Sequence, residues 1–173
     1  MENITNWVVD NSHSEIAFKV KHMMISTVTG HFEEFSAKAQ TNGDDFANGN
    51  FEFSAKTSSV NTKNKDRDAH LQSDDFFNSE KFPELKFVSK SFNGDKLVGD
   101  LTIRDITKEV ELDVEFNGIA VDPYGQTKAG FEITGEVSRK EFDLTWNAVT
   151  EAGSIVVSDK VKMIADVQFI KQA

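Results

Sequence analysis

Apolar and charged residues alternate with a period of two along much of the chain. In residues 14–22, Ile16, Phe18 and Val20 share one face while lysines occupy the other. Around 109–116 an acid stands at every odd position between Val, Leu and Phe, and residues 161–169 repeat the alternation. Such alternation predicts half-buried β-strands.

Five further segments carry the same pattern in a weaker form, which brings the predicted total to eight strands: 28–40, 48–56, 84–92, 96–104 and 127–138. Turn signals separate several of them. Asn93-Gly94-Asp95 and Asn117-Gly118 predict tight hairpins, and Asp122-Pro123-Tyr124-Gly125 predicts a further turn. Short turns of this kind make neighbouring strands antiparallel.

Three stretches interrupt the alternation, at 23–27, 57–83 and 139–159. The middle stretch is too long to be structureless inside a compact domain, so it predicts one or two short helices. Asn64 and Ser73 are the expected N-caps. With no linker or repeat in the chain, we expect a single domain over residues 1–173.

The elements together predict an all-β protein, an eight-stranded antiparallel up-and-down barrel with short helices in its connections. Closing the sheet removes its free edges. A barrel of eight strands is wide enough to be filled by side chains or to hold one slender ligand.

Composition narrows the possible partners. Of 18 aromatic residues 15 are Phe, which suits packing against hydrocarbon. The net charge of −10 argues against nucleic acid, because a negative field repels phosphate. The absence of Cys excludes disulfides, a thiolate nucleophile and a zinc finger.

Targeting signals are also missing from the sequence. No apolar run approaches the ~20 residues that a membrane-spanning helix needs, and the start MENITNWVVD lacks the features of a signal peptide. We therefore expect no transmembrane segment. The expected location is cytoplasmic for the chain as written, or periplasmic if the chain is a processed one.

Candidate catalytic residues are few. None of His13, His22, His31 and His70 has the spacing of a metal site. Residues 65–77 concentrate acids around His70, which suits acid–base chemistry or a hard cation, or an interaction of His70 with Asp66 one helical turn away. No nucleophile elbow, phosphate loop or dinucleotide motif is present, so we expect neither an enzyme nor a cofactor or metal.

Phe76, Phe77 and Phe82 lie in the long connection rather than on predicted strands. Two interpretations stay open for them. They plug one end of the barrel as ordinary core, or they line the entrance for an apolar guest.

Several motifs, in this order and spacing, resemble the YceI-like polyisoprenoid-binding proteins of bacteria. They are Trp7, Asp10, His13-Ser14, Phe18, His22, Gly30-His31-Phe32, the stretch DRDAHLQSDDFF at 66–77, Phe82-Pro83, Gly99 to Arg104, Thr107-Lys108 and Arg139 to Phe142. The chain departs from the family at Asp105 and Asp143, where relatives often carry Gly. The resemblance implies a lipocalin-like barrel whose apolar cavity holds a long isoprenoid or a similar amphiphile.

Pattern and resemblance together predict a non-enzymatic carrier that sequesters a polyprenyl chain, such as a prenyl pyrophosphate or an isoprenoid quinone. The residues expected to line the cavity are Phe18, Val20, His22, Phe51, Phe53, Phe76, Phe77, Phe82, Phe87, Leu101, Leu112, Val114, Phe131, Ile133, Met163 and Val167. Candidates for contact with a head group are His22, Arg67, His70, Arg104 and Arg139.

Two other classes of function stay open. One is a hydrolase or isomerase acting on a lipid-like substrate through Asp66, Asp68 and His70. The other is a stress-related interaction protein whose barrel is filled by its own side chains. Both a monomer and a homodimer are compatible with the sequence.

Overall fold

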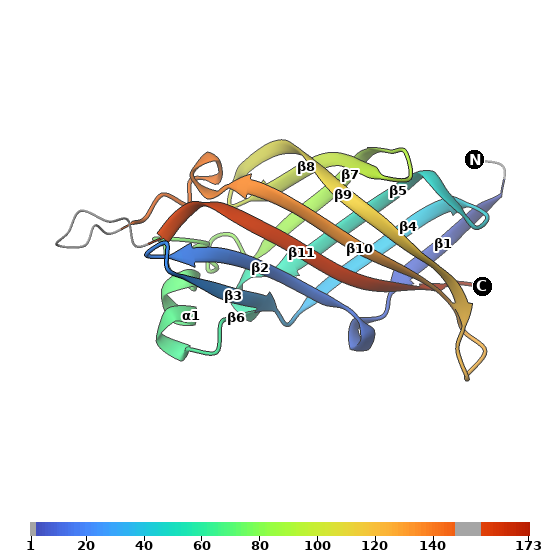
Figure 1. Cartoon of the computed structure of the whole chain (residues 1–173), viewed down its shortest axis with the longest axis horizontal. Helices are drawn as coiled ribbons and strands as arrows, with labels where there is room; N and C mark the ends of the chain where they lie inside the picture. The colour runs from blue at the N-terminus through green and yellow to red at the C-terminus, as the bar shows by residue number, and fades with distance from the viewer. Residues whose placement is uncertain (1–2, 148–156) are drawn as a thin grey trace.

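A computed structural model describes residues 3–147 and 157–173 of the chain. Its strands wrap into a twisted barrel, with the single α-helix at one end (Figure 1). The strands are β1 (Ile4–Val9), β2 (Glu15–His22), β3 (Ser26–Phe32), β4 (Phe35–Asn42), β5 (Asp45–Lys56), β6 (Val60–Asn61), β7 (Glu84–Phe92), β8 (Lys96–Ile103), β9 (Ile106–Val121), β10 (Thr127–Ser138) and β11 (Val157–Lys171). The helices are α1 (Lys65–Gln72) and the 3-10 turns η1 (Asn11–His13), η2 (Thr57–Ser59) and η3 (Arg139–Phe142).

The sheet closes because its first and last strands pair. β1 is hydrogen-bonded to β4 on one side and to β11 on the other, with Trp7 opposite Lys171. Every described pairing is antiparallel, and the ring runs β1-β4-β5-β7-β8-β9-β10-β11 and back to β1. The predicted eight-stranded, lipocalin-like barrel is confirmed.

Three of the barrel strands are interrupted. Each of them consists of two segments: β1 is followed by β2, β3 by β4, and β5 by β6. At the far end of the barrel, the segments β2, β3 and β6 pair in the order β11-β2-β3-β6. The predicted strand at 28–40 is accordingly two strands, broken at Glu33 and Glu34. There the amide of Glu34 donates to Ser59 Oγ of the neighbouring interruption at 3.0 Å. β1 was not among the predicted strands.

The turn signals had different outcomes. Asn93-Gly94-Asp95 joins β7 to β8 and Asp122 to Gly125 joins β9 to β10, as predicted. The hairpin predicted at Asn117-Gly118 is wrong, because β9 runs on to Val121. The register shifts there, since Gly130 faces Gly118 while Phe131 faces Phe116. Asn117 is therefore the extra residue of a β-bulge, and Gly118 supplies the left-handed φ of +107°.

The long connection contains the expected short helix. Asn64 caps α1, its side chain accepting from the amide of Arg67 at 3.0 Å. Ser73 is not an N-cap: it ends the same helix, and its hydroxyl donates to the carbonyl of His70 at 2.6 Å. In the described part of the chain, no helix has the length and apolarity to cross a membrane.

One end of the barrel is filled by aromatic rings. Trp7 is fully buried, and its indole N–H donates to Thr41 Oγ1 at 2.8 Å. Phe46 packs 4.8 Å from the Trp7 ring and 4.9 Å from the ring of Phe131. We name this group the Trp7 cluster; it consists of Trp7, Phe46, Phe116, Phe131 and Phe169.

A shielded ion pair ties the strand interruption at η1 to the β9–β10 hairpin. Asp10 accepts from Lys128 Nζ at 2.7 Å and contacts His13 Nδ1 at 2.8 Å. The Lys128 ammonium also lies 3.4 Å from Asp122. Chiefly the hydrogen bond from Lys128 lowers the pKa of the Asp10 carboxyl far below its ordinary value.

We expect Asp10→Asn to destabilise the protein at neutral pH by about 1–2 kcal/mol, because a charge-assisted hydrogen bond to Lys128 is lost. A lowered pKa gives stabilisation that is present above the ordinary value of 3.8 and is lost as the pH falls through the folded-state value. In urea unfolding over an acidic pH series, the free energy of unfolding should therefore fall less steeply with decreasing pH in the variant than in the unmodified protein. Asp44→Asn, which breaks an exposed ion pair with Lys171, is the control with little effect.

Asp105 and Asp143, which stand where the resembled family often has Gly, differ in backbone conformation. Asp143 ends η3 with a left-handed φ of 63°, whereas in the turn of Asp105 the left-handed residue is Arg104. Asp143→Gly should raise the free energy of unfolding by about 0.5–1 kcal/mol, since Gly adopts this conformation without steric cost. Thermal unfolding checks this, and a rise in Tm with Asp105→Gly instead would contradict the assignment.

Candidate functional site

The interior beyond the Trp7 cluster holds a cavity of about 430 Å³ with almost entirely apolar walls. This volume lies within the range of small-molecule sites. Side chains from β2, β3, β4, β5, β7, β8, β9, β10 and β11 line it, and α1 and the segment after it cover one end. The predicted residues found on its wall are Phe18, Val20, His22, Phe51, Phe53, Phe76, Phe77, Phe87, Leu101, Leu112, Val114, Phe131, Ile133, Met163 and Val167.

Two glycines make room for aromatic rings on the cavity wall. A Cβ on Gly30 would lie 2.3 Å from the Phe18 ring, and one on Gly99 would lie 2.5 Å from the Phe87 ring. Each ring therefore covers a glycine on the neighbouring strand, where any side chain would clash. Lying against the wall, the rings leave the centre of the barrel free of side chains.

The cavity is closed at one end and reaches solvent at the other. Phe131 and Phe169 belong both to its wall and to the Trp7 cluster, which fills the barrel beyond them. At the α1 end the wall includes His70, whose side chain is 38% exposed, and exposed Lys21. Most of the polar residues that line the cavity, including Lys21, His22, Arg67 and His70, lie around this opening.

His70 is the central side chain of the opening. Its Nε2 lies 2.8 Å from Asp75 Oδ2, and its ring packs edge-on against Trp146 and Phe76 at 4.7 and 5.1 Å between centroids. The expected partner one turn away, Asp66, is not the one it contacts. His70 thus joins the helix to the two aromatic rings beside the cavity.

Arg67 is the second candidate at the opening. Its Nε donates to Thr62 Oγ1 at 2.8 Å and its Nη2 to the Thr62 carbonyl at 2.6 Å. The described hydrogen bonds leave its Nη1 without a protein acceptor. Arg67 is exposed and also lines the cavity, so its guanidinium lies at the opening.

Arg139 lines the cavity but is fully engaged with the backbone. Its guanidinium donates to the carbonyls of Leu144 at 2.6 Å and Trp146 at 2.8 Å. It also donates to Ser158 at 2.9 Å and Val157 at 3.1 Å. The side chain is 3% exposed, and this burial lowers its pKa. The geometry makes Arg139 a clamp between the segment after η3 and β11, with no donor directed at a head group.

The other two predicted residues lie outside the cavity wall, namely Phe82 and Arg104. The Arg104 guanidinium donates to the carbonyls of Asp74 and Phe76 at 3.0 and 2.9 Å. It also lies over the Phe82 ring at 5.6 Å. The two residues hold the connection after α1 against the barrel. This structural role explains why both belong to the sequence motifs although neither lines the cavity.

The acids proposed for catalysis do not converge on His70. Asp68 Oδ1 instead accepts from the amide and hydroxyl of Thr62 at 2.8 and 2.6 Å. Asp10, Ser12 and His13 have the composition of a catalytic triad, yet Ser12 Oγ and Asp10 both contact His13 Nδ1, whereas a triad uses both ring nitrogens. Among residues 3–147 and 157–173, no group of three or more His, Asp and Glu side chains is arranged to hold a metal ion.

Several wall residues were not predicted. Leu97 shares the inward parity of Leu101 in β8, so the alternation contained enough signal to find it. Phe92 is out of phase with Leu85 and Phe87, because the register of β7 shifts between Ser89 and Ser91, so the alternation could not find it. Leu71 and Trp146 lie in α1 and in the segment after η3. No period-two pattern extends to these segments, and their position follows only from the packing of the barrel end.

A closed up-and-down barrel with one apolar, single-ended cavity defines a lipocalin-like binding architecture. The YceI-like domain model matches residues 7–169, and the chain belongs to this family. A UPF0312 protein of Staphylococcus aureus (strain USA300) is 38% identical over 96% of this chain and 98% of its own length.

Solved structures agree with this fold. The Campylobacter jejuni YCEI protein is 32% identical, with a TM-score of 0.75 over 90% of this chain and 91% of its own. Burkholderia cenocepacia BcnA has a TM-score of 0.78 at 21% identity, over 92% of this chain and 98% of its own. A polyisoprenoid binding domain from Saccharophagus degradans has a TM-score of 0.69 at 14% identity, over 96% and 98%. The last two show likeness of fold alone.

The clamp makes a prediction about Arg139. Arg139→Met should lower the free energy of unfolding by about 3 kcal/mol, because the buried guanidinium and its hydrogen bonds to four buried or partly buried carbonyls are lost together. Urea unfolding measures this loss, and Lys140→Met, the exposed neighbour, should change it by less than about 0.5 kcal/mol. A stable Arg139→Met protein that loses lipid binding would instead make Arg139 a head-group contact.

Proposed function

We propose that the protein binds a polyisoprenoid or a similar long-chain amphiphilic lipid and sequesters or carries it without chemical change. The observation that supports this most directly is the apolar cavity of about 430 Å³, closed by the Trp7 cluster and bordered by Lys21, Arg67 and His70 at the α1 end. That arrangement suits a ligand with a long apolar tail and one polar end. A barrel filled by its own side chains is not what the described residues form.

The energetics favour a hydrocarbon tail. Each CH₂-sized group transferred from water contributes about 0.8 kcal/mol, so several isoprene units bind strongly even after ordering costs. The proposed orientation places the tail between the wall residues and the head group near Arg67 and His70. The polyisoprenoid binding domain of Saccharophagus degradans, which shares the fold, is consistent with this class of ligand.

Native mass spectrometry with geranyl, farnesyl and geranylgeranyl pyrophosphate tests the proposal. We expect one lipid per chain, with affinity rising along the series by at least about ten-fold per isoprene unit until the cavity is full. The recovered lipid should be unaltered. Failure to bind any of the three, or a tail-independent affinity, would refute the proposal, and a converted product would favour the hydrolase or isomerase alternative.

A pair of adjacent substitutions locates the binding site. Ala165 faces the cavity from β11, and exposed Asp166 faces outward from the next position. Ala165→Trp should weaken binding by about ten-fold or more, because the indole occupies the space for the tail. Asp166→Trp carries the same new side chain on the outer wall and should leave the affinity unchanged. Equal effects of the two would argue against the cavity.

A further inference from the structure

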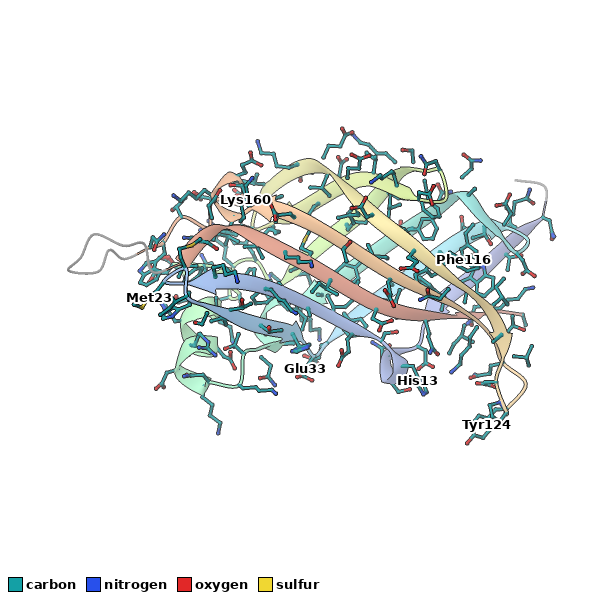
Figure 2. All side chains as sticks on the ribbon, in the orientation of Figure 1. His13, Met23, Glu33, Phe116, Tyr124 and Lys160 are labelled. Atoms are coloured by element: carbon teal, nitrogen blue, oxygen red, sulfur yellow. The ribbon has the colours of Figure 1, made fainter. Side chains whose placement is uncertain are left out.

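The β2–β3 hairpin ends in an apolar tip beside the opening of the cavity. Met23, Met24 and Ile25 are 37%, 66% and 81% exposed. The flanking residues Lys21 and His22 belong to the cavity wall, so the tip is continuous with the opening. Figure 2 shows Met23 at one end of the barrel and Tyr124 at the opposite end.

The residues of this tip are poorly suited to its backbone. The amide of Ile25 donates to the carbonyl of His22 at 3.1 Å, and both central residues have left-handed φ angles, 52° at Met23 and 59° at Met24. Hairpin turns with two such angles favour Asn-Gly. Two methionines therefore occupy positions where they cost conformational energy and expose apolar surface. Stability of the turn does not account for them.

Beyond Glu15, the hairpin contains no acid in an otherwise acidic chain. Residues 16–32 include Lys19, Lys21, His22 and His31 and neither Asp nor Glu, although the chain carries 29 acids. Lys19 and Lys21 are exposed behind the tip. An apolar end backed by lysines is the pattern of a segment that enters the boundary of a bilayer while its ammonium groups reach the phosphates.

Further from the tip, the same wall carries the opposite charge. Glu115, Glu132, Asp166 and Glu15 stand directly opposite one another on the neighbouring strands β9, β10, β11 and β2, and all four are exposed. This row of carboxylates opposes contact between the side of the barrel and an anionic surface. The two charges together favour an end-on approach through the β2–β3 hairpin.

We propose that the tip formed by Met23, Met24 and Ile25 docks on a lipid bilayer and brings the cavity opening to the membrane surface. The inference rests on the proposed function, since a lipid with a long prenyl tail resides in membranes. It adds the site of exchange: the tail passes between the bilayer and the cavity beside this hairpin, where Lys21 and His22 face the opening.

The decisive variant replaces Met23-Met24 by Asn-Gly, the pair that this turn prefers. We expect cosedimentation with vesicles of phosphatidylcholine and phosphatidylglycerol, free of prenyl lipid, to fall about ten-fold. The Tm should be unchanged or higher, which separates lost docking from misfolding. Binding of detergent-dispersed geranylgeranyl pyrophosphate should stay the same, while its transfer from vesicles slows.

The matched control removes exposed apolar surface from the other end of the barrel. Val121 and Tyr124 are 67% and 91% exposed, and Val121→Ser with Tyr124→Ser should leave vesicle binding unchanged. The inference is overturned if the Asn-Gly variant sediments with vesicles like the unmodified protein. It is also overturned if that variant changes only the oligomeric state, because the tip then contacts a second copy.

The two proposals fail in distinguishable ways. If the unmodified protein binds vesicles through the tip but takes up no prenyl lipid from detergent, the proposed ligand is wrong and the docking surface stands. If it takes up the lipid and the Asn-Gly variant exchanges it with vesicles at the unmodified rate, the cavity is right and the docking surface is wrong.

Discussion

The space inside the barrel that no side chain fills is the constraint on which the rest of the structure depends. At ~24 cal/mol per Å³, giving up side-chain packing over about 430 Å³ corresponds to on the order of 10 kcal/mol, comparable with the net stability of a whole domain. Two features offset it. The closed ring gives every strand of the barrel partners on both edges, and the Trp7 cluster packs one end densely.

The sequence determines much of this architecture because a barrel wall has two faces of opposite character. Alternation therefore located the long strands and most of the side chains that face the cavity. β1 was not predicted as a strand because its outward residues Ile4 and Val8 are apolar as well, so its sequence shows no alternation. These two side chains are 58% and 45% exposed. The hairpin predicted at Asn117-Gly118 was wrong for another reason. A bulge uses the same residues as a turn, and only long-range pairing with β10 distinguishes the two.

The polar residues of the site were harder to assign than its walls. Arg67, Arg104 and Arg139 look alike in sequence, yet one borders the cavity, one holds the connection after α1, and one clamps four carbonyls. Which acceptors surround a guanidinium depends on backbone carbonyls from segments far apart in the chain, and no residue pattern records those. The period-two alternation predicts side-chain positions only within strands. The cavity opening is built largely from the connections between strands, where this pattern is absent.

The pairing of β1 with β11 also has a consequence for the synthesis of the protein. Trp7 meets Lys171 across almost the whole chain, so a growing polypeptide cannot complete the ring until its last strand has left the ribosome. Until then the apolar inner face and two strand edges stay uncovered. Such high contact order predicts slow folding. The outward row of carboxylates repels other nascent chains, and this repulsion protects the incomplete sheet from aggregation until β11 has paired.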